Sequence, residues 1–250
     1  MSILSAKKTT APKSISVSWG IVLTGICLTM ILVGHYLALV FAPESVNLTT
    51  AVERFSQRIL YIHVGAAWGG FFPLLATCIA GIVYLITRRI IWDDVALASA
   101  EIGLCLMTIF LVTGSVWARP TWNVWWTWSP RVTISAISWL MYVGYLMLRG
   151  AIDDPERTAR FASIYGIIAF ISVPINYMAI RWWRDIHPTV VGSGASEGQG
   201  GFAMGNTIRD TLLFWVVIYT VFYTTMLYHR LKLAKTAREV ELLKRRLWGI

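Results

Sequence analysis

The chain has 250 residues, of which 56% are hydrophobic and only 14% charged, and its formal net charge is +9. Soluble domains carry about 25% charged residues, so this composition excludes an ordinary soluble protein. A positive charge can mark a nucleic-acid-binding protein, but the basic residues here lie in short clusters between long apolar stretches. We therefore expect an integral membrane protein with no nucleic-acid partner.

The first apolar run, residues 19–41, follows a lysine-containing tail and contains no Asp, Glu, Lys or Arg. The apolar core of a secretory signal is about 7–15 residues long and is followed by a cleavage site with small residues. This run is longer and has no such site. We expect it to remain in the protein as the first membrane-spanning helix.

Five further apolar runs follow along the chain. A helix needs about 20 apolar residues to cross a hydrocarbon core about 30 Å thick, and lipid-exposed backbone must satisfy its polar groups internally. The six predicted spanning helices are residues 19–41, 59–86, 102–118, 132–148, 161–180 and 211–228. Pro73 and Pro174 are expected to kink the second and fifth of them. The predicted fold is all-α, a polytopic membrane protein with one domain over residues 1–250.

The distribution of basic residues predicts the orientation of these helices. With the N-terminus in the cytoplasm, 15 of the 22 basic residues, including all six lysines, lie on the inner side. The seven on the outer side are all arginine. Because inner loops are enriched in Lys and Arg, both termini are expected to be cytoplasmic, which suits a bacterial inner membrane. The basic tail, residues 230–250, is predicted to be a helix on the anionic inner leaflet, in preference to a docking element for a dedicated partner.

A tryptophan-rich segment, VWARPTWNVWWTWSPRVT at 116–133, lies in the predicted outer loop between helices 3 and 4. Its five tryptophans are Trp117, Trp122, Trp125, Trp126 and Trp128. An interfacial aromatic belt is the alternative interpretation, but a belt spreads its aromatics over many helix ends on both faces. Concentration in one loop favours a platform for a large planar ligand or for a cation.

Two of the four histidines are predicted to lie on the same outer face as the tryptophans. His63 is near the outer end of the second helix, and His187 lies just beyond the outer end of the fifth. His35 sits deeper in the first helix and could serve as a reserve ligand, whereas His229 lies at the inner end of the sixth helix. Ionisable residues within or at the edge of a membrane are functional candidates.

Two imidazoles beside a tryptophan platform suggest a metal within a planar ring. Zinc would need three or four protein ligands, and this segment offers no cysteine or carboxylate cluster. Haem needs only axial ligands from the protein, and its propionates would suit outer arginines. The candidates for propionate contacts are Arg119, Arg131 and Arg184, with Arg181 also on the outer side. Solvated loop charges are the alternative for each arginine.

Three segments resemble the haem exporter protein C (CcmC) family of cytochrome c maturation. They are RILYIHVGAAW around His63, LVTGSVWARPTWNVWWTWSPRVT in the second outer loop, and INYMAIRWWRDIHPT around His187. The resemblance implies that these two histidines bind haem b axially and non-covalently, and that the tryptophans of the loop form its hydrophobic platform. Two positions depart from the family pattern. Ser129 follows the tryptophan cluster where the family usually has Asp, and Gly65 replaces a common proline.

The resemblance also implies a function in c-type cytochrome biogenesis. The protein would hold haem at the outer face and deliver it to a periplasmic haem chaperone (CcmE-like). Its other implied partners are a small single-span protein (CcmD-like) and ABC transporter subunits (CcmA/CcmB-like). It would not be an enzyme, and it has no phosphate-binding loop of the Walker type. The alternatives are an electron-transfer cytochrome b subunit and an aromatic-cage transporter of an organic cation.

Overall fold

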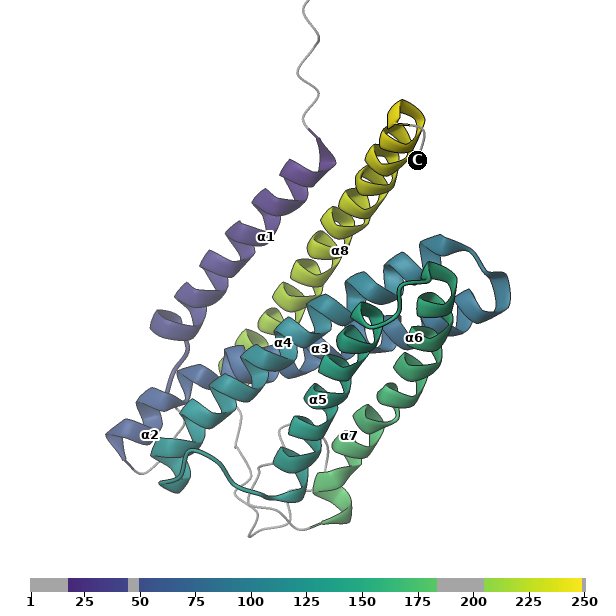
Figure 1. Ribbon diagram of the computed structural model, residues 1–250. Helices are drawn as coiled ribbons and strands as arrows, with labels where there is room; N and C mark the ends of the chain where they lie inside the picture. The colour runs from purple at the N-terminus through teal and green to yellow at the C-terminus, as the bar shows by residue number, and fades with distance from the viewer. Residues whose placement is uncertain (1–17, 45–49, 184–204, 249–250) are drawn as a thin grey trace, which may run out of the picture.

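The computed structural model describes residues 18–44, 50–183 and 205–248, which form helices and no strand. Figure 1 shows these helices as a bundle whose long members run between two opposite ends. The elements are α1 (Trp19–Tyr36), the short π-helix η1 (Leu37–Phe41), α2 (Ala51–Ser56), α3 (Arg58–Thr87), α4 (Ile90–Trp122), α5 (Pro130–Gly150), α6 (Pro155–Phe170), α7 (Ser172–Trp182) and α8 (Asn206–Trp248).

Six helical segments of the described chain are long and apolar enough to cross a membrane. They correspond in order to the six predicted runs, so the predicted fold class is confirmed. The fifth is divided into α6 and α7 at Ile171. Pro174 has no N–H to donate to the carbonyl of residue 170, and this loss weakens the helix there, as the sequence predicts. Pro73, by contrast, does not interrupt α3, which is continuous from Arg58 to Thr87.

Local backbone chemistry fixes the helix ends that flank the tryptophan-rich connection. α4 ends at Trp122, and its C-cap residue Asn123 adopts the left-handed conformation with φ 59°. Asparagine tolerates this conformation better than most residues do, and a left-handed residue stops a helix. α5 then begins with Pro130 at its first position, where the missing N–H costs nothing. The connection at 123–129 is therefore held between two firm helix ends.

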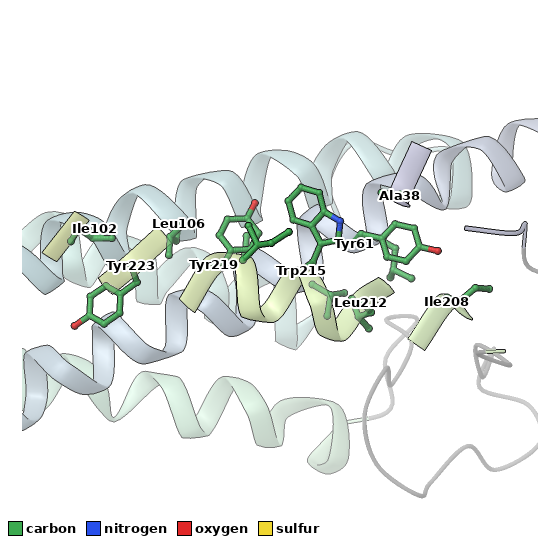
Figure 2. Packing of buried hydrophobic residues seen from close by; sticks show 13 residues of the cluster. Ala38, Tyr61, Ile102, Leu106, Ile208, Leu212, Trp215, Tyr219 and Tyr223 are labelled. Carbon is green, nitrogen blue, oxygen red and sulfur yellow. The ribbon is translucent and has the colours of Figure 1, made fainter. Parts of the chain in front are cut away.

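α3 lies at the centre of the bundle and packs against α4, α6 and α8. Large aromatic side chains of α8 fill the space beside it. Trp215 and Tyr219 of α8 are buried, together with Tyr61 of α3 and Leu106 of α4 (Figure 2). Gly69 of α3 faces Tyr219 with no room for a Cβ atom. In lipid there is little hydrophobic driving force for helices to associate, so they associate largely through close packing, which small residues such as glycine permit.

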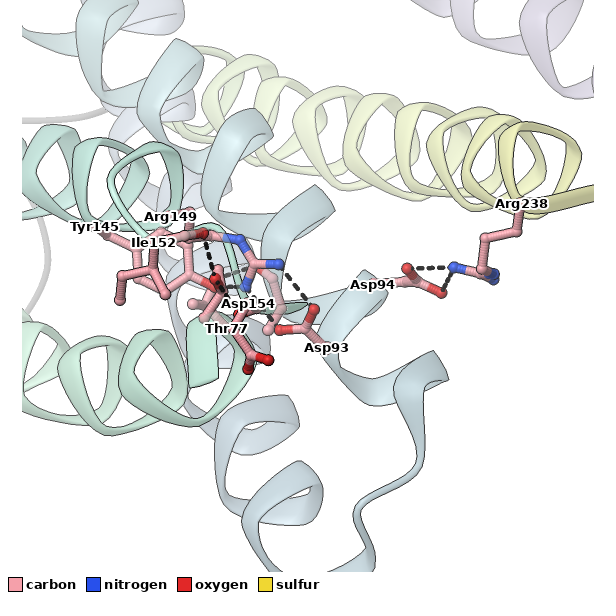
Figure 3. Close-up of polar contacts among 10 residues, drawn as sticks. Thr77, Asp93, Asp94, Tyr145, Arg149, Ile152, Asp154 and Arg238 are labelled. Atoms are coloured by element: carbon pink, nitrogen blue, oxygen red, sulfur yellow. Dashed lines mark hydrogen bonds and ion pairs between the residues drawn. The ribbon is translucent and has the colours of Figure 1, made fainter. Parts of the chain in front are cut away.

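Ion pairs join the helices at the end of the bundle that carries the α3–α4 turn. Arg149 of α5 makes a two-fold contact with Asp93 of α4, at 2.6 and 2.7 Å, and both side chains are largely buried (Figure 3). The neighbouring Asp94 forms an ion pair with Arg238 of α8. These carboxylates are at the start of α4, which begins 12 residues earlier than the apolar run from 102 that predicted it.

The basic tail continues α8 as one uninterrupted helix to Trp248. The sequence predicted a helix here, but one separate from the spanning segment and lying on the inner leaflet. The helix has 43 residues, which at about 1.5 Å per residue is far longer than a hydrocarbon core about 30 Å thick. Arg230 pairs with Glu101 of α4 at 2.7 Å, and with Arg238 it holds this extension against α4. The tail therefore extends the sixth spanning helix.

Candidate functional site

A pocket enclosing about 460 Å³ of space, part of it open to solvent, lies where α3, α4, α5 and the 123–129 connection meet. In Figure 1 this region lies at the same end of the bundle as α2 and the C-terminal end of α7. The predicted site residues that line the pocket are His63, Trp117, Trp122, Trp125, Trp126 and Arg131. The fold thus brings together one of the two predicted iron ligands, four of the five tryptophans and one arginine.

His63 is held by α4 in a defined orientation. Its Nδ1 lies 2.9 Å from the backbone carbonyl oxygen of Phe110, and its ring stacks on the Phe110 ring with centroids 4.6 Å apart. A carbonyl oxygen can only accept a hydrogen bond, so Nδ1 carries the proton. In the neutral imidazole the lone pair is then on Nε2. Histidines that bind metals are commonly oriented by such a second hydrogen bond, so His63 has the tautomer that an iron ligand needs.

Gly114 provides the space for the His63 ring. A Cβ atom built at Gly114 would lie 2.7 Å from Cε1 and 3.2 Å from Nδ1 of His63. Carbon atoms in van der Waals contact are normally about 3.5–4.0 Å apart, so no larger residue fits without moving the ring. The imidazole therefore lies between the Phe110 ring and the bare backbone of α4, and only 8% of the residue is exposed.

Hydrogen bonds to α4 hold the connection that carries the indoles. Ser115 donates through Oγ to the carbonyl oxygen of Trp125 at 2.7 Å. Arg119 donates through Nη1 to the carbonyl oxygen of Asn123 at 2.6 Å. Within the pocket wall, Trp117 is buried and meets Trp122 edge to face, with ring centroids 5.2 Å apart. These contacts hold the connection and its indoles against α4.

Trp128 and Arg119 do not line the pocket. Trp128 is 80% exposed and contacts Trp126 edge to face at 5.9 Å, so it lies on the outer side of the wall. Arg119 instead caps the end of α4 through its bond to Asn123. Arg181, which the sequence placed on the outer side, is bound to its own helix neighbour Tyr177, with the guanidinium carbon 4.4 Å from the ring centroid.

His187 and Arg184 lie outside the residues that the structure describes. The other two histidines take part in contacts between helices. His35 bonds through Nδ1 to the carbonyl oxygen of Ile31 at 2.8 Å and meets the Trp215 ring edge to face. It does not line the pocket. His229 lies 3.0 Å through Nε2 from Oγ1 of Thr24, which joins α8 to α1 far along the chain from the tryptophan-rich connection.

The sequence did not single out Phe110, Gly114 or Ser115, which orient His63 and hold the connection. None of these residue types marks a metal site by itself. Phe110 acts through its backbone carbonyl oxygen, Gly114 through its lack of a side chain, and Ser115 through its hydroxyl group. The only signal was the pair of adjacent small residues, Gly114 and Ser115, within the bulky apolar run of 102–118. Among the described residues no three His, Cys, Asp or Glu side chains gather as a metal cage. Among the described lining residues, the pocket thus offers one imidazole with largely apolar walls, an arrangement suited to a metal that brings its own equatorial ligands.

Comparisons with known protein sequences identify the family to which the chain is similar. A sequence model of the family described as "Heme exporter protein C" matches residues 4–246. The heme exporter protein C of Bradyrhizobium diazoefficiens is 32% identical over 169 residues, which cover 68% of this chain and 63% of that protein. A putative cytochrome c biosynthesis ccmC-like mitochondrial protein of Marchantia polymorpha is 30% identical over 66% of this chain and 68% of its own length. The heme exporter protein C of Escherichia coli K12 is 33% identical over 53% of this chain. The alignments span 63%, 68% and 54% of these three relatives, respectively.

Proposed function

This chain belongs to the heme exporter protein C family, and from that premise we propose that it binds haem b non-covalently and hands it on for c-type cytochrome biogenesis. The haem is cargo, held at the outer face of the cytoplasmic membrane and delivered to a periplasmic haem chaperone of the CcmE type. The protein carries haem without transforming it.

The observation that carries this proposal is the pairing of one oriented imidazole with a wall of indoles in one pocket. His63 donates from Nδ1 to the Phe110 carbonyl, so its Nε2 has the chemistry of an axial iron ligand. The indoles beside it supply apolar surface for the porphyrin. Burial of apolar surface contributes roughly 25 cal/mol per Å², and a macrocycle has two large faces to bury. Ligation and burial together suit a flat cargo carrying a metal.

His187 is proposed as the second axial ligand. It follows α7 in the chain by five residues, and α7 ends at the same end of the bundle as the pocket (Figure 1). Arg131 lines the pocket and is proposed to contact a propionate, because a guanidinium matches a carboxylate in charge and shape. Arg119, whose guanidinium donates to the carbonyl oxygen of Asn123 at the end of α4, and Arg184 are also proposed as propionate contacts.

The proposed partners are inferred from membership of the family rather than from a docking surface on this chain. They are a haem chaperone, a small single-span protein of the CcmD type, and ABC transporter subunits of the CcmA and CcmB type. A b-type cytochrome would need histidine pairs that face each other within helices, and an organic-cation cage would need no histidine. The oriented His63 supports haem holding over the cage.

An absorption spectrum of the purified full chain tests the proposal. The wild-type protein is expected to show a haem Soret band, and His63→Ala is expected to lose most of it at equal protein. His229→Ala is the matched control, since this histidine binds Thr24 at the other end of the bundle, and it should keep the band. Rapid reduction by a quinol would instead support the cytochrome. If His229→Ala bleached the protein and His63→Ala did not, the proposed ligand would be wrong. Transfer is then measured by mixing loaded protein with haem-free chaperone.

A further inference from the structure

One polar atom in the wall of the pocket lacks the partner that its burial requires. Nε1 of Trp126 is shielded from solvent and has no hydrogen-bond acceptor in the structure as described for 18–44, 50–183 and 205–248. A buried donor left without an acceptor costs about 1–3 kcal/mol, and native proteins rarely leave one. Such an atom at a ligand site points to an acceptor that the ligand brings.

The pocket that Trp126 lines also carries positive charge. Arg131 lines the same pocket and belongs to the first turn of α5, whose N-terminus carries the positive end of the helix dipole. Ser129, at the N-cap of α5, makes no side-chain capping bond. An acceptor that reaches Trp126 here therefore gains most if it is anionic.

Trp215 provides a contrast within the same molecule. Its Nε1 is also buried without an acceptor among the described residues. However, it packs in the core of α8 against Tyr219 and lines no part of the pocket. Both indoles have an N–H without an acceptor in the described part of the chain, but only Trp126 also lines the pocket, together with the cationic Arg131.

We propose that Nε1–H of Trp126 and the guanidinium of Arg131 together receive one carboxylate of the cargo, so that Trp126 selects porphyrins with free carboxylates. This inference rests on the proposed function and adds a second role to the indole wall. A carboxylate is an acceptor at both oxygens, so one oxygen can take the indole N–H and the other the guanidinium. Charge-assisted hydrogen bonds of this kind are about twice as strong as neutral ones. A porphyrin whose carboxylates are esterified keeps its apolar faces but loses the negative charges.

The test uses metal-free protoporphyrin IX and its dimethyl ester as probes, with the full-length protein in detergent micelles. Neither probe has iron, so binding does not depend on a bond to His63. Fluorescence titration gives the two affinities. The wild-type protein should bind the acid at least about 10-fold more tightly than the ester, as a hydrogen bond to a charged group implies. Trp126→Phe, which keeps an aromatic face but lacks the N–H, should lose about 10-fold for the acid and little for the ester.

Trp125→Phe is the matched control. Trp125 also lines the pocket, but it is 58% exposed, so water can satisfy its N–H. Its replacement should change the affinities for acid and ester by the same factor. Arg131→Gln should reproduce the selective loss of the acid.

The outcomes separate this inference from the proposed function. Equal wild-type affinity for acid and ester overturns the inference, and so does an equal loss of both probes in Trp126→Phe. In either case a haem Soret band that still depends on His63 leaves the proposed function standing. If the wild-type protein binds neither haem nor protoporphyrin, the proposed function is wrong, and the inference falls with it. Equal wild-type affinities overturn the inference even if Trp126→Phe does not fold.

Discussion

Gly114→Ala tests whether the orientation of His63 matters for haem binding. The new methyl group would lie 2.7 Å from Cε1 of His63, whereas carbon contacts are normally about 3.5–4.0 Å. The ring would have to retreat by about 1 Å, and its 2.9 Å bond to the Phe110 carbonyl would pass out of hydrogen-bonding range. Loss of a partner that orients a metal ligand typically lowers metal affinity about 10–100-fold. We therefore expect haem affinity to fall at least about 10-fold, or about 1.4 kcal/mol.

The assay is a haem titration of the purified variant, followed at the Soret band. Alanine is a better helix former than glycine by about 0.5–1 kcal/mol, so helix propensity gives no reason for the variant to unfold. Gly25→Ala is the matched control, because a Cβ atom there meets nothing within 4 Å, and its haem affinity should not change. Wild-type affinity in Gly114→Ala, combined with its loss in His63→Ala, would refute the argument that the space at Gly114 sets the geometry of the ligand.

Three further predictions concern orientation, stability and the extent of the indole wall. Reporter fusions after Ser129 and at the C-terminus should report outer and cytoplasmic locations, respectively, as the distribution of basic residues predicts, and export-dependent activity of the C-terminal fusion would contradict the six-span orientation. Asp93→Asn should destabilise the protein by about 3 kcal/mol, because it breaks a buried ion pair. Glu239→Gln, in an exposed pair, should leave the thermal midpoint in detergent unchanged, and equal midpoints for both variants would argue against a role for the buried pair. Trp122→Ala should lose more haem than Trp128→Ala, since only the first lines the pocket, and the reverse order in a Soret titration would place the cargo outside this pocket.

The sequence alone determined the number and order of the spanning helices. The length of an apolar run and the thickness of a bilayer are enough to identify a spanning segment, and neither depends on the rest of the fold. The sequence also marked the tryptophan-rich connection and His63, because their composition is unusual in a short window. Its helix bounds were too short at α4 and α8. Hydropathy falls where charged residues begin, but the helices continue there, since Asp94 and Arg238 neutralise each other across the bundle.

Only the tertiary structure decided which of these residues meet. Trp126 and Trp128 are two positions apart and chemically identical, yet one lines the pocket and the other is 80% exposed. The proton position on His63 is set by Phe110, which is 47 residues away, and the space for its ring is set by Gly114. These properties depend on how α3 packs against α4. A local pattern specifies a helix and its apolar character, whereas the lining of a pocket is fixed by contacts between residues far apart in the chain.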